Sequence, residues 1–133
     1  MKRSLGRSVL WSLALLATTA AAAEPPSRLK LAEDLARAHA ASPQGRDWLA
    51  ANAPKAGQLM IPVLNKCVPD AADGELTAFS IYVRLSQKGK IQEIVTELDA
   101  ELGLCMTRES REVQLPAAPR EDFWFQLNLA AML

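Results

Sequence analysis

The chain has few of the residues and motifs from which catalytic and metal sites are built. Its 133 residues include one histidine, His39, and two cysteines. We find no glycine-rich phosphate loop, no Gly-x-Ser-x-Gly motif and no zinc-binding pair of histidines in the sequence. The sequence therefore predicts no catalytic residue, no cofactor and no metal, and we expect a protein that is not an enzyme.

The chain also lacks an excess of charge of either sign. Fifteen basic residues balance fifteen acidic ones, so the formal net charge is zero. Three of the basic residues lie in the first 23 positions, which leaves residues 24–133 with 12 basic and 15 acidic side chains. A weakly acidic segment without a basic stripe argues against nucleic acid as a partner.

The first 23 residues have the three parts of a secretory signal peptide. Basic residues come first, then the apolar run Val9–Ala17, then the small residues Ala21–Ala23. The apolar run is shorter than the roughly 20 residues that cross a membrane. We expect cleavage after Ala23, export to the periplasm and no membrane span in the mature chain; an uncleaved membrane anchor is the alternative.

Cys67 and Cys105 are the two cysteines of a chain that we expect to be exported. In an oxidising compartment such a pair most often forms one disulfide. A redox-active pair is the weaker alternative, because the two are not spaced as Cys-x-x-Cys. A metal site is weaker still, since His39 is far from both in sequence. The predicted bond ties an amino-terminal helical part to a later helix.

Three segments have the pattern of β-strands. Phe79–Leu85 and Asp122–Leu129 each alternate apolar and polar residues, as in a strand with one buried face. Ile91–Leu98 is less regular, which predicts a bulge or burial on both faces. Gly89 lies between the first two segments and supplies the positive φ that a tight turn requires.

The remaining segments read as helices. Ala100–Val113 has an apolar stripe that must pack against the sheet. Ser42-Pro43 and Asn52-Ala53-Pro54 each resemble the start of a helix, and Pro62 predicts a kink. We therefore expect one small α+β domain over residues 24–133. Its amino-terminal helices (24–67) precede a β-β-α-β unit (77–129), in which a three-stranded antiparallel sheet packs on a helix.

Trp124, Gln126 and Asn128 share the polar side of the last predicted strand. An exposed tryptophan beside two amides would suit a protein contact, so these three residues are the candidate binding site. The alternative is that the amino-terminal helices cover this side and that Trp124 is structural. The acidic run from Glu97 to Glu101 is interpreted as a solvent-exposed connection between the second predicted strand and the following helix. Its carboxylates favour the N-terminus of that helix.

The second half of the chain resembles the carboxy-terminal domain of TonB and its periplasmic relatives. The residues that carry the resemblance are Phe79–Leu85, Gly89, Ile91–Val95, Leu115-Pro116, Pro119 and Phe123–Leu129. It is closer to relatives with one cysteine before the first strand and one in the helix. The resemblance implies a small α+β scaffold that recruits a partner segment to a sheet edge. It does not imply energy transduction, which would need a retained anchor and a long proline-rich spacer.

Two functions are consistent with these observations. The first is a soluble periplasmic protein-binding or adaptor module whose partner is another envelope or secreted protein. The second is an immunity or inhibitor protein that neutralises a secreted toxin in the periplasm. An enzyme ranks third, because the motifs of catalytic sites are missing.

Overall fold

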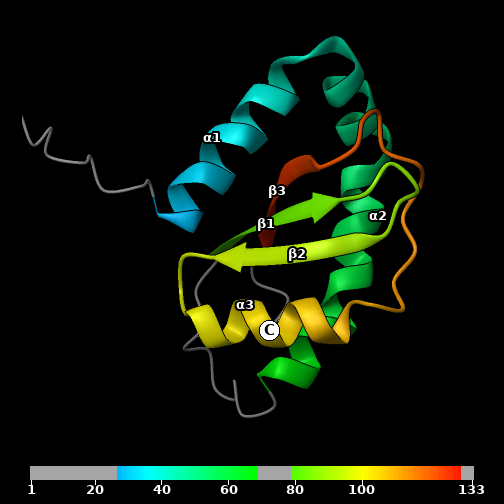
Figure 1. Cartoon of the computed structure of the whole chain (residues 1–133). Helices are drawn as coiled ribbons and strands as arrows, with labels where there is room; N and C mark the ends of the chain where they lie inside the picture. The colour runs from blue at the N-terminus through cyan, green and yellow to red at the C-terminus, as the bar shows by residue number, and fades with distance from the viewer. Residues whose placement is uncertain (1–26, 69–78, 130–133) are drawn as a thin grey trace, which may run out of the picture.

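A computed structural model describes residues 27–68 and 79–129 of the chain, in which helices precede a mixed helix and strand unit. The predicted signal peptide (1–23) lies outside these residues. The elements in order are α1 (Arg28–Ala41), α2 (Pro43–Cys67), β1 (Phe79–Leu85), β2 (Ile91–Thr96), α3 (Ala100–Glu109) and β3 (Phe123–Leu129). The predicted α+β class and the β-β-α-β order are confirmed (Figure 1).

The sheet is antiparallel and has the strand order β2-β1-β3, so β1 is its central strand. The turn between β1 and β2 has Gly89 at φ 85°, as the sequence predicts. The expected irregularity of the second strand is also confirmed. Arg84 pairs with Glu93 and Leu85 pairs with Ile91, so Gln92 is an extra residue on β2.

The prediction of two separate helices between Pro43 and Cys67 was wrong, because α2 is one continuous helix of 25 residues. Its start is as predicted: Ser42 caps it, accepting a hydrogen bond from the N–H of Gly45. Pro54 lies inside the helix, where a proline removes one hydrogen bond and costs about 3 kcal/mol. Buried residues lie on both sides of that proline, from Trp48 to Leu64, and we attribute the continuity of α2 to their packing.

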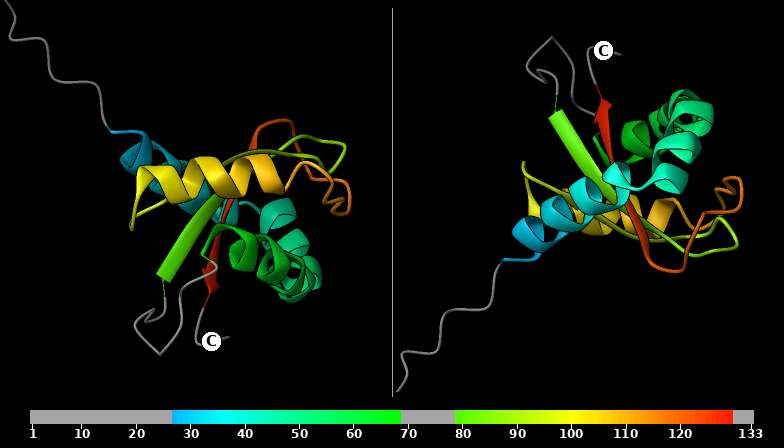
Figure 2. Two further views of the ribbon diagram at one scale, coloured as in Figure 1. Left: turned by 90° about the horizontal axis from the view of Figure 1, so that it is seen from below. Right: turned by 90° about the horizontal axis from the view of Figure 1, so that it is seen from above.

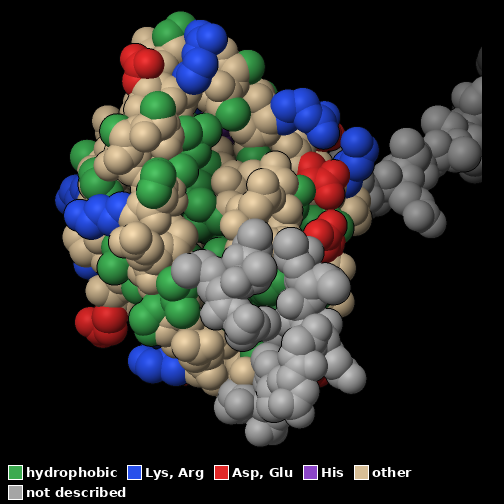
Figure 3. Space-filling model, turned by 180° about the vertical axis from the view of Figure 1, so that it is seen from behind, with side chains coloured by type: hydrophobic (Ala, Val, Ile, Leu, Met, Phe, Trp, Pro, Cys, Tyr) green, Lys and Arg blue, Asp and Glu red, His purple; other side chains and the backbone are tan. Residues whose placement is uncertain are grey.

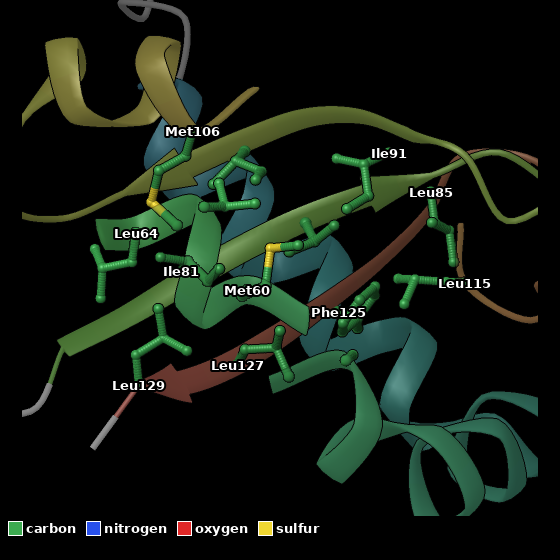
Figure 4. Packing of buried hydrophobic residues seen from close by; sticks show 14 of the residues in the cluster. Met60, Leu64, Ile81, Leu85, Ile91, Met106, Leu115, Phe125, Leu127 and Leu129 are labelled. Carbon is green, nitrogen blue, oxygen red and sulfur yellow. The ribbon is translucent and has the colours of Figure 1, made fainter. Parts of the chain in front are cut away.

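The main hydrophobic core lies between one face of the sheet and helices α2 and α3. Met60 and Leu64 of α2 and Met106 of α3 lie over sheet residues such as Ile81 and Phe125 (Figure 4). The alternating apolar residues of β1 and β3 all point to this face. Phe79, Ile81, Val83 and Leu85 come from β1, and Phe123, Phe125, Leu127 and Leu129 come from β3.

Helix α1 covers part of the opposite face of the sheet. Ala32 and Ala36 of α1 form a second buried cluster with Tyr82 of β1 and Trp124 of β3. Two alanines on one side of the helix allow it to lie close to the strands. Helices therefore flank both faces of the sheet, and α3 lies beside β2 (Figure 2).

The predicted disulfide is present and joins the two helices of the main core. Cys67 is the last residue of α2 and Cys105 lies in α3; their sulfur atoms are 2.09 Å apart and their Cα atoms 5.8 Å apart. The Cα distance is ordinary for a disulfide. The bond fixes the end of α2 against α3, as expected for a structural link.

Charged side chains of both signs are interspersed on the face shown in Figure 3, with no patch of a single sign there. This distribution agrees with the balanced composition.

Within the described ranges 27–68 and 79–129, no helix has the length and hydropathy needed to cross a membrane.

Candidate functional site

Trp124 is buried, so the expectation that it is an exposed contact anchor was wrong. Its side chain points away from the main core, as its position in the strand predicts, but it is only 2 % exposed. Ala32 and Ala36 of α1 pack against it, together with Tyr82. The alternative stated from the sequence is therefore the correct one, and Trp124 is a core residue beneath the amino-terminal helix.

Two arginines lie over the indole of Trp124. The guanidinium carbon of Arg28 is 5.3 Å from the ring centroid, and that of Arg84 is 6.0 Å away. Glu93 holds both arginines: it accepts from Arg28 Nε at 2.7 Å and from Arg84 Nε at 3.3 Å. The hydrogen bond from Arg28 is the main reason why the pKa of Glu93 lies below its usual value. Cation–π contacts and an ion pair thus close this side of Trp124.

Trp48 of α2 is also a structural residue, buried in the main core. Its indole packs on Phe123 and Phe125, with ring centroids 5.3 and 5.0 Å apart respectively. Its Nε1–H donates to the carbonyl of Ala117 at 2.9 Å. The amphipathic ring thereby fills the core and satisfies its one polar group.

The backbone of β3 alternates between groups that face β1 and groups that face away. The N–H of Trp124 donates to Nδ1 of His39 at 2.9 Å rather than to β1, so residue 124 faces outward. Pairs in an antiparallel ladder alternate, and therefore Gln126 and Asn128 also direct their N–H and C=O groups away from β1. The three candidate residues of the sequence are thus the residues that form the outer edge of the sheet.

The opposite edge, along β2, is covered in part by other segments of the chain. The N–H of Ile94 faces outward and donates to Oγ1 of Thr107 in α3 at 2.9 Å. Gly103 makes this approach possible, because a Cβ there would lie 2.9 Å from the carbonyl oxygen of Ile94. Beyond the start of β2, the N–H of Leu115 donates to the carbonyl of Gly89. Helix α3 therefore covers the β2 edge at Ile94, and the returning segment covers the chain just before this strand.

The edge along β3 is different beyond Trp124. Within the part of the chain that the structure describes, the outward N–H and C=O groups of Gln126 and Asn128 have no hydrogen-bond partner. Their side chains are exposed, and both bond to Ser80 of β1: Ser80 Oγ donates to Asn128 Oδ1 at 2.7 Å, and Gln126 Nε2 donates to Ser80 Oγ at 3.0 Å. We call this arrangement of Ser80, Gln126 and Asn128 the edge site.

A groove of about 330 Å³ adjoins the edge site and separates α1 from α2. Its lining includes Glu33 and Arg37 of α1, Leu49 of α2, Tyr82 of β1 and Gln126 of β3. The groove offers polar and apolar surface next to the outward backbone of β3. This is the geometry that an added extended segment uses.

Sequence reasoning missed three side chains that define the two edges. Ser80 orients the amides of the edge site, Thr107 covers part of the β2 edge, and His39 caps the N–H of Trp124. Of the three, only Ser80 could have been identified from the sequence pattern, since it lies on the same polar side of the sheet as Gln126. Thr107 and His39 act through contacts 13 and 85 residues away, which no local pattern encodes.

The other candidates have structural roles in the fold. In the acidic run, Asp99 caps α3 by accepting from the N–H of Glu101 at 2.9 Å, as the sequence predicts. No group of three or more histidine, cysteine or acidic side chains within residues 27–68 and 79–129 has the geometry to hold a metal ion.

Comparison with known proteins finds no match to a protein family, to a curated protein or to a solved structure.

Proposed function

We propose that this protein is a non-catalytic protein-binding or adaptor module of the cell envelope, and that it binds a partner through the β3 edge. A segment of the partner would add to the sheet beside Gln126 and Asn128, with its neighbouring side chains against the groove between α1 and α2. Main-chain hydrogen bonds would supply affinity, and side chains in the groove would supply selectivity.

The single observation that supports this proposal is the difference between the two edges of the sheet. The β2 edge is covered at Ile94 by Thr107 of α3, and the segment around Leu115 bonds to Gly89 just before the strand. The β3 edge, by contrast, presents outward backbone groups with no described partner. An edge of this kind is a template for pairing with another chain. The resemblance to TonB-like domains would imply the same mode, but it remains a prediction.

Substitution of Gln126 by proline tests whether the backbone is what binds. Proline is tolerated on an edge strand where the N–H faces outward, so Gln126→Pro should keep the fold. It removes one outward donor and places a ring where the added strand would lie. Mature protein and variant would be used as bait in envelope extract. We expect a partner captured by the wild type to be reduced at least tenfold with Gln126→Pro.

Gln126→Ala is the matched control, because it removes the side chain but keeps the backbone N–H. Capture retained by Gln126→Ala and lost by Gln126→Pro supports strand addition. Undiminished capture by a folded Gln126→Pro variant would refute it. If the captured protein is a secreted toxin that the bait inactivates, the immunity role replaces the adaptor role while the edge remains the binding surface.

We propose further that the protein acts after export to the periplasm. The support is the order of basic, apolar and small residues over positions 1–23. Protein recovered from the periplasm should then begin at Glu24. Measurement of the intact mass checks this, and a mass that includes residues 1–23 would show that the leader is retained.

A further inference from the structure

His39 occupies the contact between the last turn of α1 and the start of β3. Its imidazole is 7 % exposed and stacks on Phe123, with ring centroids 5.6 Å apart and planes 13° from parallel. Nδ1 accepts the N–H of Trp124 at 2.9 Å. Among the described residues, this is the one hydrogen bond that joins a side chain of α1 to the backbone of β3.

The direction of that hydrogen bond fixes the state of the ring. Because the donor is a backbone N–H, Nδ1 must carry a lone pair, and the hydrogen of the neutral ring is therefore on Nε2. Nε2 has no partner among the described residues, and no buried polar side-chain atom there lacks one, so Nε2 reaches solvent. A proton added at Nδ1 would place two N–H groups against each other and break the bond.

The surroundings of the ring oppose a positive charge. A cavity of about 500 Å³ beside His39 is lined by residues of α1, of the first turn of α2 and of the segment before β3. The charged group in that lining is the guanidinium of Arg120. The carboxylate of Glu121, the next residue in the chain, is not part of that lining and accepts from the N–H of Gln87. Burial first, and the charge of Arg120 second, hold the pKa of His39 below its usual value.

We propose that His39 is a pH-sensitive latch that holds the end of α1 against β3 and releases it when Nδ1 is protonated. Release breaks the link between α1 and the N–H of Trp124 and opens the contact with Phe123. The latch does not depend on the proposed function. Its consequence for binding does: the freed N–H of Trp124 would extend the outward-facing row of β3 that begins at Gln126.

The sign of the effect on stability follows from linkage. The pKa of His39 is lower in the folded protein than in the unfolded chain, so the unfolded chain binds the proton more readily. The contribution of the latch is complete above the unfolded pKa of about 6.5. It falls as the pH drops from there toward the folded pKa. The protein should therefore be less stable at pH 5 than at pH 7.

Amide hydrogen exchange of Trp124, followed by NMR between pH 7.5 and 4.5, measures the latch directly. After correction for intrinsic exchange, the protection of Trp124 should fall by up to tenfold for each pH unit between about 6.5, the ordinary pKa of a released imidazole, and the lower pKa of His39 in the folded protein, because over that range the released ring binds a proton that the latched ring does not. The amide of Phe125, which faces β1, should keep its protection over the same range. Protection of Trp124 that is independent of pH would overturn the proposal.

Two variants separate the latch from general acid destabilisation. His39→Asn keeps an acceptor that does not titrate, and its Trp124 protection should not change with pH. His39→Phe keeps a ring on Phe123 without an acceptor, and its Trp124 protection should be low at every pH while Phe125 stays protected. The same fall with pH in His39→Asn as in the wild type would refute the proposal. Neither measurement needs a binding partner, so failure of the latch and failure of the proposed function are distinguishable.

Discussion

Substitution of Trp124 by alanine is expected to lower the free energy of unfolding by about 3–5 kcal/mol, the range for large buried aromatic side chains. The indole is 2 % exposed and fills the space between α1 and the outer face of the sheet. Its loss would leave a cavity against Ala32 and Ala36 and would remove the surface on which Arg28 and Arg84 lie. Denaturant unfolding followed by circular dichroism measures this change.

A matched control is Leu104→Ala in α3, where the side chain is 69 % exposed. This variant should change the free energy of unfolding by less than about 0.5 kcal/mol, as surface substitutions do. Trp124→Phe should fall between the two, because it keeps a ring in the cavity. A loss below about 1 kcal/mol for Trp124→Ala would contradict the packing described here and would restore an exposed role for the indole.

Removal of the disulfide is the second large effect. The bond joins Cys67 and Cys105, which are 38 residues apart. For a loop of this size, the chain-entropy model gives about 4 kcal/mol of stabilisation, because the disulfide reduces the conformational entropy of the unfolded chain. The double variant Cys67→Ser, Cys105→Ser should therefore lose about 4 kcal/mol, a large part of the free energy of unfolding of a small domain, which is typically about 5–15 kcal/mol.

Reductant provides the internal control for this prediction. The wild type should lose a similar amount of stability when a thiol reductant is added, whereas the double serine variant should not respond. Titration of free thiols in the denatured, unreduced wild type should find none. Two titratable thiols, or a wild type whose stability does not change on reduction, would contradict a structural disulfide.

The strands could be predicted from the sequence because their signals are local. Phe79–Leu85 and the strand that begins near Asp122 alternate cleanly, and the alternation fixes which residues face the main core. Gly89 marks the turn because few other residues adopt its positive φ. The irregular apolar spacing after Gly89 indicated the bulge that the structure places at Gln92.

The cover over the outer face of the sheet could not be predicted, because it depends on contacts between distant segments. The alternation of residues along the strand placed Trp124 on the polar side of the sheet. That side is buried at Trp124 only because Ala32 and Ala36 of α1 pack against it. The same limit explains α2. Local rules stop a helix before Pro54, whereas packing along the whole helix keeps it intact.

The edge site was predicted in part. Gln126 and Asn128 were identified from their exposed positions, and the structure leaves both exposed. Their significance as an edge was not readable from the sequence. Strand order decides which strand is outermost, and Thr107 and His39 decide which stretches of each edge are covered.

The proposed mode of binding is tested most directly by amide hydrogen exchange of β3, with and without the captured partner. If a partner strand adds to this edge, the amides of Gln126 and Asn128 should become at least tenfold more protected when the partner is added. The amide of Leu127 faces β1, and its protection should change little. Binding that leaves the exchange of both Gln126 and Asn128 unchanged would show that the partner uses another surface, and the account of the β3 edge would be wrong.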